Sequence, residues 1–326
     1  MASLLDMPEV IRKVILDYGV CKHNKEIYLF HTISNNQQFI KVAKSKNGFL
    51  FDSTKNTPQI IDKNKKNFSI QNINNLKFSQ INKNKYILTA KSTVYQKGYI
   101  FSSRNGIMWT ENNLLPINET SQIIAKPYKQ KGYNLFFGDK EISIMQTNDF
   151  KNWENRKIIL TPRDNHFDRY PLQLFSVIPT QSGTVIFYLV IIKKREGNHF
   201  LIGAALVENG NPSNVLWRSS HAIWEQPNEW DTKTIVPLGA AEIDEKLLFY
   251  FATNEPNVYA ISDDSFSELL HIKKLLHTPK LNKIAKNPII TPVVQHWWEN
   301  TATFNTAAIN ETSQIIAKPY KQKGYN

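Results

Sequence analysis

The sequence of 326 residues predicts an all-β fold, a five-bladed β-propeller with a short N-terminal helix and an irregular C-terminal tail. Two observations support this prediction. A short apolar run followed by Ser or Thr, Asn or Asp and an aromatic residue recurs four times, at 40–51, 99–109, 142–153 and 258–266. An apolar segment precedes each copy, at 27–30, 86–89, 133–137 and 247–251. Each pair is typical of two strands followed by a turn.

A fifth pair of apolar segments, at 185–189 and 201–206, fills the interval between the third and fourth copies. A β-rich unit that recurs roughly every 50 to 60 residues is typical of a propeller blade, since one blade cannot bury both of its faces alone. A β-sandwich also has short strands at regular spacing, but it does not explain why the same strand-turn-aromatic motif returns. The repeat therefore favours the propeller, which we place at 16–275.

The segment 1–15 is expected to form a short amphipathic helix before the propeller. Its apolar stripe consists of Leu4, Leu5, Val10, Val14 and Ile15. The segment is interrupted by four charged residues, Asp6, Glu9, Arg12 and Lys13. It therefore matches neither a signal peptide nor a membrane span. We expect no membrane partner.

The C-terminal tail, 276–326, ends in a duplication. Residues 117–134 and 309–326 are the same eighteen residues, whereas the five units share only a loose pattern. The identity therefore reflects either a recent event or an artefact: a recombination, an error of sequence assembly or an engineered joining. We assign the tail no function.

The composition excludes several classes of function. Cys21 is the only cysteine, so no disulfide within the chain is possible, and we expect a cytoplasmic location. The eight His are dispersed without metal-ligand spacing, and we expect neither a metal nor another cofactor. No Gly-rich phosphate loop or nucleophile elbow occurs, which argues against kinase, dehydrogenase and serine-hydrolase activities.

The formal net charge of +12 raises the question of nucleic-acid binding. The charge comes mainly from Lys residues scattered beside Asn, and the densest run, 62–67, lies in an expected loop between strands. A solvated turn explains this run without a phosphate partner, so we do not expect nucleic acid as a ligand.

Three stretches resemble the five-bladed propellers of glycoside hydrolase family 130, the β-mannoside phosphorylases and their hydrolytic relatives. Residues 287–292, Asn-Pro-Ile-Ile-Thr-Pro, followed by Trp-Glu at 298–299 and by 304–309, resemble the opening phrase of that family. Residues 203–218 resemble its fourth-blade phrase, and 236–251 its fifth. The resemblance implies a glycan or oligosaccharide as the ligand.

The opening phrase lies at the wrong end of the chain. The tail therefore resembles the start of a second, tandem propeller. A worn version of the same phrase, at 16–21, precedes the segment 27–30 at the spacing of the family. Partners expected on this basis are a tandem propeller domain or a second copy of the chain.

The resemblance also implies which residues form the site. The acid of the family is the Asp of a Glu-Asp-Pro-Arg phrase that opens the second blade, and here the aligned residues 74–77 are Asn-Asn-Leu-Lys. Asn75 replaces the acid and Lys77 replaces the Arg. The His-Arg pair that holds phosphate in phosphorylases falls near Phe137 and Gly138, which argues against phosphorolysis.

Other side chains remain candidates. Asp168 matches a Trp-Asp position of the family, and Glu255 falls where the family has a sugar-contacting Asp, so both are candidate catalytic carboxylates. An inverting hydrolase needs two carboxyl groups roughly 6.5 to 9.5 Å apart. The expected ligand-binding residues are Asp17, Tyr18, Asn75, Lys77, Phe137, Asp139 and Tyr170.

Three functions follow. We expect a carbohydrate-active protein of the β-mannoside glycosidase or phosphorylase type with weakened or lost catalysis and retained glycan binding. An active glycoside hydrolase on β-mannosides or related glycans is one alternative. A propeller that serves only as a protein-interaction scaffold is the other.

Overall fold

The computed structural model describes residues 3–5, 15–23, 25–33, 39–53, 58–69, 72–127, 131–195, 197–227, 235–244, 246–253, 258–262, 307–308 and 315–316. Over these residues the regular structure is β-strand, and no α-helix occurs. The chain divides into two compact units, Met1–Leu276 and His277–Asn326.

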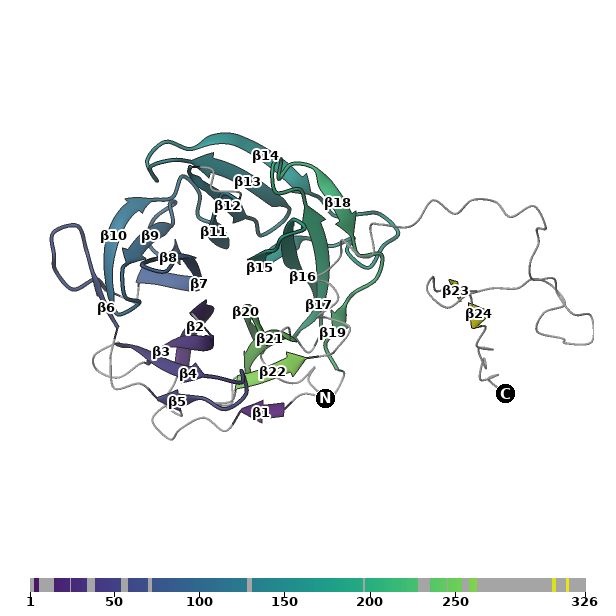
Figure 1. Cartoon of the computed structure of the whole chain (residues 1–326), viewed down its shortest axis with the longest axis horizontal. Helices are drawn as coiled ribbons and strands as arrows, with labels where there is room; N and C mark the ends of the chain where they lie inside the picture. Colours follow the sequence, from purple (N-terminus) through teal and green to yellow (C-terminus); the bar gives the residue numbers. More distant parts are fainter. Residues whose placement is uncertain are drawn as a thin grey trace, which may run out of the picture. The chain divides into compact units, whose positions relative to one another are not determined.

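The first unit is all-β, as predicted, and its sheets have a propeller-like arrangement (Figure 1). The first sheet has the order β2 (Ile15–His23), β3 (Glu26–Ile33), β4 (Phe39–Ser45) and β5 (Asp52–Ser53). The second has the order β7 (Ile73–Asn82), β8 (Lys85–Ser92), β9 (Tyr99–Ser103) and β10 (Met108–Leu114), and β6 (Gln59–Ile61) pairs with β10 in parallel.

The remaining sheets follow in chain order. The third contains β11 (Ser121–Ala125), β12 (Tyr133–Phe137), β13 (Ile142–Thr147) and β14 (Glu154–Leu160). The fourth contains β15 (Leu172–Pro179), β16 (Thr184–Lys194) and β17 (Gly197–Val207), and both β18 (Val215–Arg218) and β19 (Trp224–Glu225) pair with β17. The fifth contains β20 (Ile235–Ile243), β21 (Lys246–Thr253), β22 (Val258–Ser262) and β1 (Ser3–Leu5).

Five apolar clusters hold the sheets together. One cluster lies between each pair of consecutive sheets, and a further one joins the fifth sheet to the first. The alternation of side chains along each strand makes this possible, since successive residues point to opposite faces. On β21, Leu247 and Phe249 pack toward the fourth sheet, while Leu248 and Tyr250 pack toward the first. The sheets therefore form a closed ring.

The innermost strands lie around the centre of the ring: β2, β7, β11, β15 and β20 (Figure 1). Each is an edge strand of its sheet. Side chains at the ends of these strands are therefore brought together from different sheets.

The repeated turn of the sequence motif is a set of local hydrogen bonds. A Ser or Thr hydroxyl accepts a hydrogen bond from the main-chain N–H three residues later, and an Asn or Asp side-chain oxygen accepts one from the N–H two residues later. The residue pairs are Ser45 with Asn47, Ser103 with Asn105, and Thr147 with Asp149. Such side chains replace main-chain partners in tight turns. In the fourth copy, 263–266 lie outside the described residues.

The predicted N-terminal helix is wrong where the structure describes the segment. Ser3–Leu5 form strand β1, which pairs antiparallel with β22, and Ile15 already belongs to β2. Residues 6–14 lie outside the described residues. The sheet edge of β22 offers main-chain groups that a local amphipathic pattern cannot reveal. The start of the first unit thus completes its last sheet.

The second unit contains one described strand pair, β23 (Ala307–Ala308) with β24 (Ile315–Ile316), in antiparallel register. β24 belongs to the duplicated segment and matches Ile123–Ile124, which lie within β11 of the first copy. The same Ile-Ile pair is therefore extended in both copies.

Deleting residues 1–5 is expected to lower the melting temperature by about 2–6 °C, because β22 then loses its outer partner and a few net hydrogen bonds of about 1 kcal/mol each. Thermal unfolding followed by circular dichroism measures the change. Replacing Ser3, Leu4 and Leu5 by Ala keeps the main-chain pairing and should cost less. A deletion variant that melts with the parent protein would show that β1 does not stabilise the ring.

Candidate functional site

Polar side chains gather where the innermost strands of the second, third and fourth sheets begin. Asn75 lies near the start of β7, Thr120 directly before β11, and Gln173 on β15. The Thr120 hydroxyl accepts hydrogen bonds from the side-chain amides of Asn75, at 3.4 Å, and of Gln173, at 3.1 Å. One hydroxyl therefore connects three sheets at the same end of their inner strands.

A carboxylate and an ammonium group complete this arrangement. Asp139 follows β12 and accepts hydrogen bonds from the Gln173 amide and from the main-chain N–H of Thr120, both at 3.3 Å. Lys91, near the end of β8, forms an ion pair with Asp139 at 2.7 Å, and the two side chains are 23% and 27% exposed. We call Asn75, Lys91, Thr120, Asp139 and Gln173 the polar cluster. It brings together two residues expected from the sequence, Asn75 and Asp139.

The backbone at Asn75 departs from regular strand geometry. Its φ is +51°, in the left-handed region, which Asn tolerates better than most residues. The pairing of β7 with β8 shifts register between Asn74 and Lys77, as in a β-bulge. Bulges re-aim side chains at the edges of sheets. The side chain at this bulge is an amide, which donates a hydrogen bond to Thr120 but cannot act as a general acid at neutral pH.

Two carboxyl groups beside each other have opposite pKa shifts. Burial and the negative charge of Asp139 raise the pKa of Glu119, against the opposing charge of Arg156. For Asp139, burial acts to raise the pKa, but hydrogen bonds from Lys91 and Thr120 outweigh it and hold the pKa below its ordinary value. Asp139 is thus an anion at neutral pH, while Glu119 binds a proton more readily than a free carboxyl group does.

Lys77 lies two residues beyond Asn75 on β7. Its side chain is 8% exposed, and the ammonium donates hydrogen bonds to the main-chain oxygens of Phe175, at 2.7 Å, and Leu238, at 3.0 Å. Those carbonyls belong to β15 and β20. Lys77 was expected to bind a ligand, but its ammonium is bonded to main-chain carbonyls. It thereby connects three innermost strands, β7, β15 and β20.

Asp168 belongs to a separate buried group of charges. Its carboxylate is completely buried and accepts hydrogen bonds from Arg163, at 3.0 and 2.9 Å, and from Arg218, at 2.6 Å. The Tyr188 hydroxyl donates a further hydrogen bond to this carboxylate at 2.8 Å. Burial acts to raise the pKa of Asp168, but hydrogen bonds from Arg163 and Tyr188 and the charge of Arg218 hold it below its ordinary value. This carboxylate fixes the loop before β15 to β16 and β18.

Two of the other expected residues pack against apolar cores. Phe137 is completely buried in the core between the second and third sheets. Tyr170 packs against the core between the third and fourth sheets, and its hydroxyl accepts a hydrogen bond from Arg169 at 3.1 Å. Asp17 and Tyr18 lie on β2, and Glu255 lies outside the described residues.

The turn after Phe137 begins with Gly138, where a side chain would not fit. A Cβ atom there would collide with the main-chain oxygen of Glu141. The main-chain N–H of Gly138 donates to the oxygen of Thr120, and its oxygen accepts from the N–H of Leu174. This glycine therefore lets the turn that carries Asp139 approach the strands on either side.

Sequence reasoning missed four groups of this region: Lys91, Glu119, Thr120 and Gln173. Each lies within two residues of a strand end, on the side of the sheets that carries Asn75 and Asp139. A polar residue at the end of an expected strand was the one sequence signal that could have identified them. Glu119 and Thr120 also lie within the duplicated segment.

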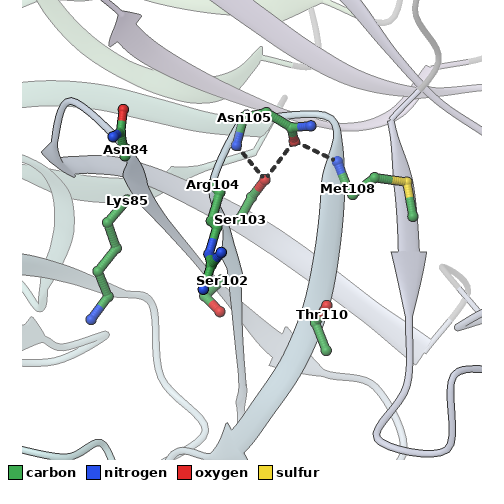
Figure 2. A pocket seen from close by; sticks show the side chains of 8 residues that line it. All are labelled: Asn84, Lys85, Ser102, Ser103, Arg104, Asn105, Met108 and Thr110. Atoms are coloured by element: carbon green, nitrogen blue, oxygen red, sulfur yellow. Dashed lines mark hydrogen bonds between the residues drawn. The ribbon is translucent and has the colours of Figure 1, made fainter.

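A cavity of about 580 Å³ lies at the opposite end of the second sheet, at the β7–β8 and β9–β10 turns (Figure 2). Its lining consists of Asn84, Lys85, Ser102, Ser103, Arg104, Asn105, Met108 and Thr110. Over the described ranges, no three His, Cys, Asp or Glu side chains gather as a metal site requires. The same ranges contain no helix long and apolar enough to cross a membrane.

No protein-family model and no curated protein matches the sequence. Solved structures do. A glycosyl hydrolase from Bacteroides ovatus is 16% identical, with a TM-score of 0.61, over 77% of this chain and 84% of that one. A β-1,2-mannobiose phosphorylase from Listeria innocua, in complex with β-1,2-mannobiose, is 16% identical, with a TM-score of 0.59, over 82% of this chain and 95% of that one.

A third similar structure is from the GH130 family of mannoside phosphorylases, which contains glycoside hydrolases that target beta-1,2 mannosidic linkages in Candida mannan. It is 16% identical, with a TM-score of 0.61, over 76% of this chain and 84% of that one. The chain shares its fold with these enzymes. At such identities the likeness establishes the fold alone.

Replacing Asp168 by Asn is expected to lower the free energy of unfolding by about 3 kcal/mol at pH 7, because the charges of Arg163 and Arg218 lose their buried partner. Urea denaturation measures the difference. Asp164→Asn, an exposed carboxylate of the same loop, is the control and should have no effect.

The contribution of Asp168 also depends on pH. Because its folded-state pKa lies below the ordinary value of 3.8, the stabilisation is complete above that value and disappears as the pH falls through the lower folded-state pKa. The parent protein should therefore lose stability more steeply than Asp168→Asn below about pH 4. Parallel pH profiles of the two proteins would contradict the assignment.

Proposed function

We propose that the chain is a carbohydrate-active protein of the β-mannoside glycosidase or phosphorylase type, in which the polar cluster binds a glycan and catalysis is weakened or lost. In this proposal each of the five sheets is one blade of a five-bladed propeller. The observation that carries it is the polar cluster itself, on a fold shared with glycosidases and mannoside phosphorylases.

The chemistry of the polar cluster suits sugar hydroxyls, which both donate and accept hydrogen bonds. Asn75 and Gln173 each offer an amide with donors and an acceptor, Asp139 offers acceptors only, and Lys91 donors only. A few fixed polar groups of this kind orient a ligand in a binding site. Their mutual hydrogen bonds hold them in place before a ligand arrives, which reduces the entropic cost of binding.

An exposed aromatic residue, Tyr95, follows Lys91 of the polar cluster by four residues, and its ring meets that of Tyr99 edge to face at 6.3 Å. Val94 and Tyr95, in the loop after β8, are 57% and 59% exposed. Their main-chain N–H groups donate to the Ser92 hydroxyl at 3.1 and 2.8 Å, and the Asn118 amide donates to the oxygen of Tyr95 at 2.9 Å. Asn118 directly precedes Glu119. The loop is therefore fastened while its two apolar side chains face solvent, as a sugar ring that stacks on an aromatic face requires.

Three features support weakened catalysis. Asn75 has no proton for a leaving oxygen, and general acid catalysis typically contributes about a hundredfold or more to the rate. Asp139 is held as an anion by Lys91 and Thr120. The lowered pKa of Asp168 and its two Arg partners oppose a role as a proton donor.

One observation favours the alternative, an active glycoside hydrolase. Glu119 and Asp139 are neighbouring carboxyl groups whose environments move their pKa values apart, which is the arrangement that separates a proton donor from an ionised partner. In that alternative Glu119 supplies the proton that Asn75 cannot.

Titration of the protein with β-1,2-, β-1,3- and β-1,4-linked mannobiose tests the proposal. Gln173→Ala and Tyr95→Ala should each weaken binding by about five- to tenfold, since a hydrogen bond or an aromatic contact contributes about 1 kcal/mol. Ile158→Ala, at another exposed apolar side chain, should leave binding unchanged. Absence of binding by the parent protein would contradict the proposal and favour a scaffold.

Sugar release from the same mannosides, with and without phosphate, separates the two candidates. The proposal predicts no release by the parent protein and a gain of activity in Asn75→Asp. Release by the parent protein that Glu119→Gln abolishes would instead establish the hydrolase.

A further inference from the structure

At the cavity at the opposite end of the second sheet, the turn between β9 and β10 engages two side-chain oxygens, those of Ser103 and Asn105. The Ser103 hydroxyl donates to the Asn105 oxygen at 3.1 Å, and that oxygen accepts from the N–H of Met108 at 3.0 Å (Figure 2). The Ser103 hydroxyl also accepts from the N–H of Gly106 at 2.9 Å, and the Asn105 oxygen from that of Ile107 at 2.9 Å. The side-chain nitrogen of Asn105 remains available as a donor.

Two cations stand at this cavity, and its lining includes no carboxylate. Arg104 is exposed and makes no hydrogen bond or ion pair with any residue that the structure describes. Its five N–H donors form the planar fork that matches oxyanions. Figure 2 shows the side chains of Lys85 and Arg104 extending toward the same end of the cavity.

Lys85 is held in place by the neighbouring sheet. Its ammonium donates to the Tyr133 hydroxyl and lies 4.6 Å from the centre of the Tyr133 ring and 4.9 Å from that of Phe150. An ammonium has three donors, and one is used here. The positive charge is therefore positioned without being neutralised.

The same turn in the other sheets provides an internal comparison. Ser103 pairs with Tyr86, the residue after Lys85. In the first sheet Ser45 pairs with Ile27, so the position of Lys85 holds Glu26, which forms an ion pair with Lys44 at 3.4 Å. In the third sheet Thr147 pairs with Tyr133, and the position holds Gly132. Of these three turns, the one in the second sheet has two cations, Lys85 and Arg104, beside it.

We propose that the cavity lined by Lys85 and Arg104 binds an oxyanion, a phosphate or sulfate group that is either free or carried on a larger ligand. Arg104 receives two of its oxygens through the guanidinium fork, and Lys85 donates to another. A volume of about 580 Å³ admits a sugar-sized group together with the anion. The net charge of +12 favours the approach of such a ligand. This site is independent of the polar cluster and of its proposed function.

Calorimetric titration of the full chain with inorganic phosphate, inorganic sulfate, mannose 6-phosphate and mannose tests the proposal. We expect the anionic probes to bind and mannose not to compete. Arg104→Gln should weaken binding of the anions about tenfold or more, since it removes charge-assisted hydrogen bonds. Stronger binding of mannose 6-phosphate than of phosphate would indicate an anion carried on a larger ligand, and equal binding would indicate the free ion.

Lys151→Ala is the matched control, because Lys151 is an exposed lysine in the equivalent turn of the third sheet. Arg104 is also exposed, so its replacement should leave the melting temperature unchanged. Lys85→Met should reduce binding as well. Failure of all three anions to bind, or equal affinity in the parent protein and Arg104→Gln, would overturn the proposal.

Discussion

The ammonium of Lys77 is the interaction on which the centre of the structure depends. It leaves β7 and reaches main-chain carbonyls of β15 and β20, so one side chain connects the inner strands of the second, fourth and fifth sheets. A buried ammonium is stable only when its donors are satisfied, which fixes the distance between these strands. Asn75 lies two residues earlier on the same strand. The contacts of Lys77 therefore also help to fix the position of Asn75 in the polar cluster.

The ring supplies the rigidity that the cluster needs. Each sheet buries both faces against its neighbours, and β1 adds the outer strand of the fifth sheet from the start of the chain. Thr120 and Gln173 belong to different sheets, and the core between the third and fourth sheets fixes their separation. Side chains on rigid strand ends keep their geometry better than side chains on free loops. Binding groups at this end are therefore positioned by the whole fold.

Much of the fold follows from local signals. The Ser103 and Asn105 turn is predicted by its own residues because its hydrogen bonds are local, and the continuous apolar run from Leu247 to Phe251 predicts a strand buried on both faces. The strand at Ser3–Leu5 could not be predicted, because Leu4 and Leu5 fit a helical stripe and their partner strand, β22, lies at the far end of the unit in sequence. The cross-sheet contacts of Thr120 and Gln173 have no local signal, since they exist only once the ring has closed.

A crystal structure of the protein with β-1,2-mannobiose tests the central claim most directly. If the polar cluster is a glycan site, the disaccharide will lie within hydrogen-bond distance of Asn75, Asp139 or Gln173, above the level of Lys77. A disaccharide bound only elsewhere, or a polar cluster that stays unchanged and empty at saturating sugar, would contradict the account.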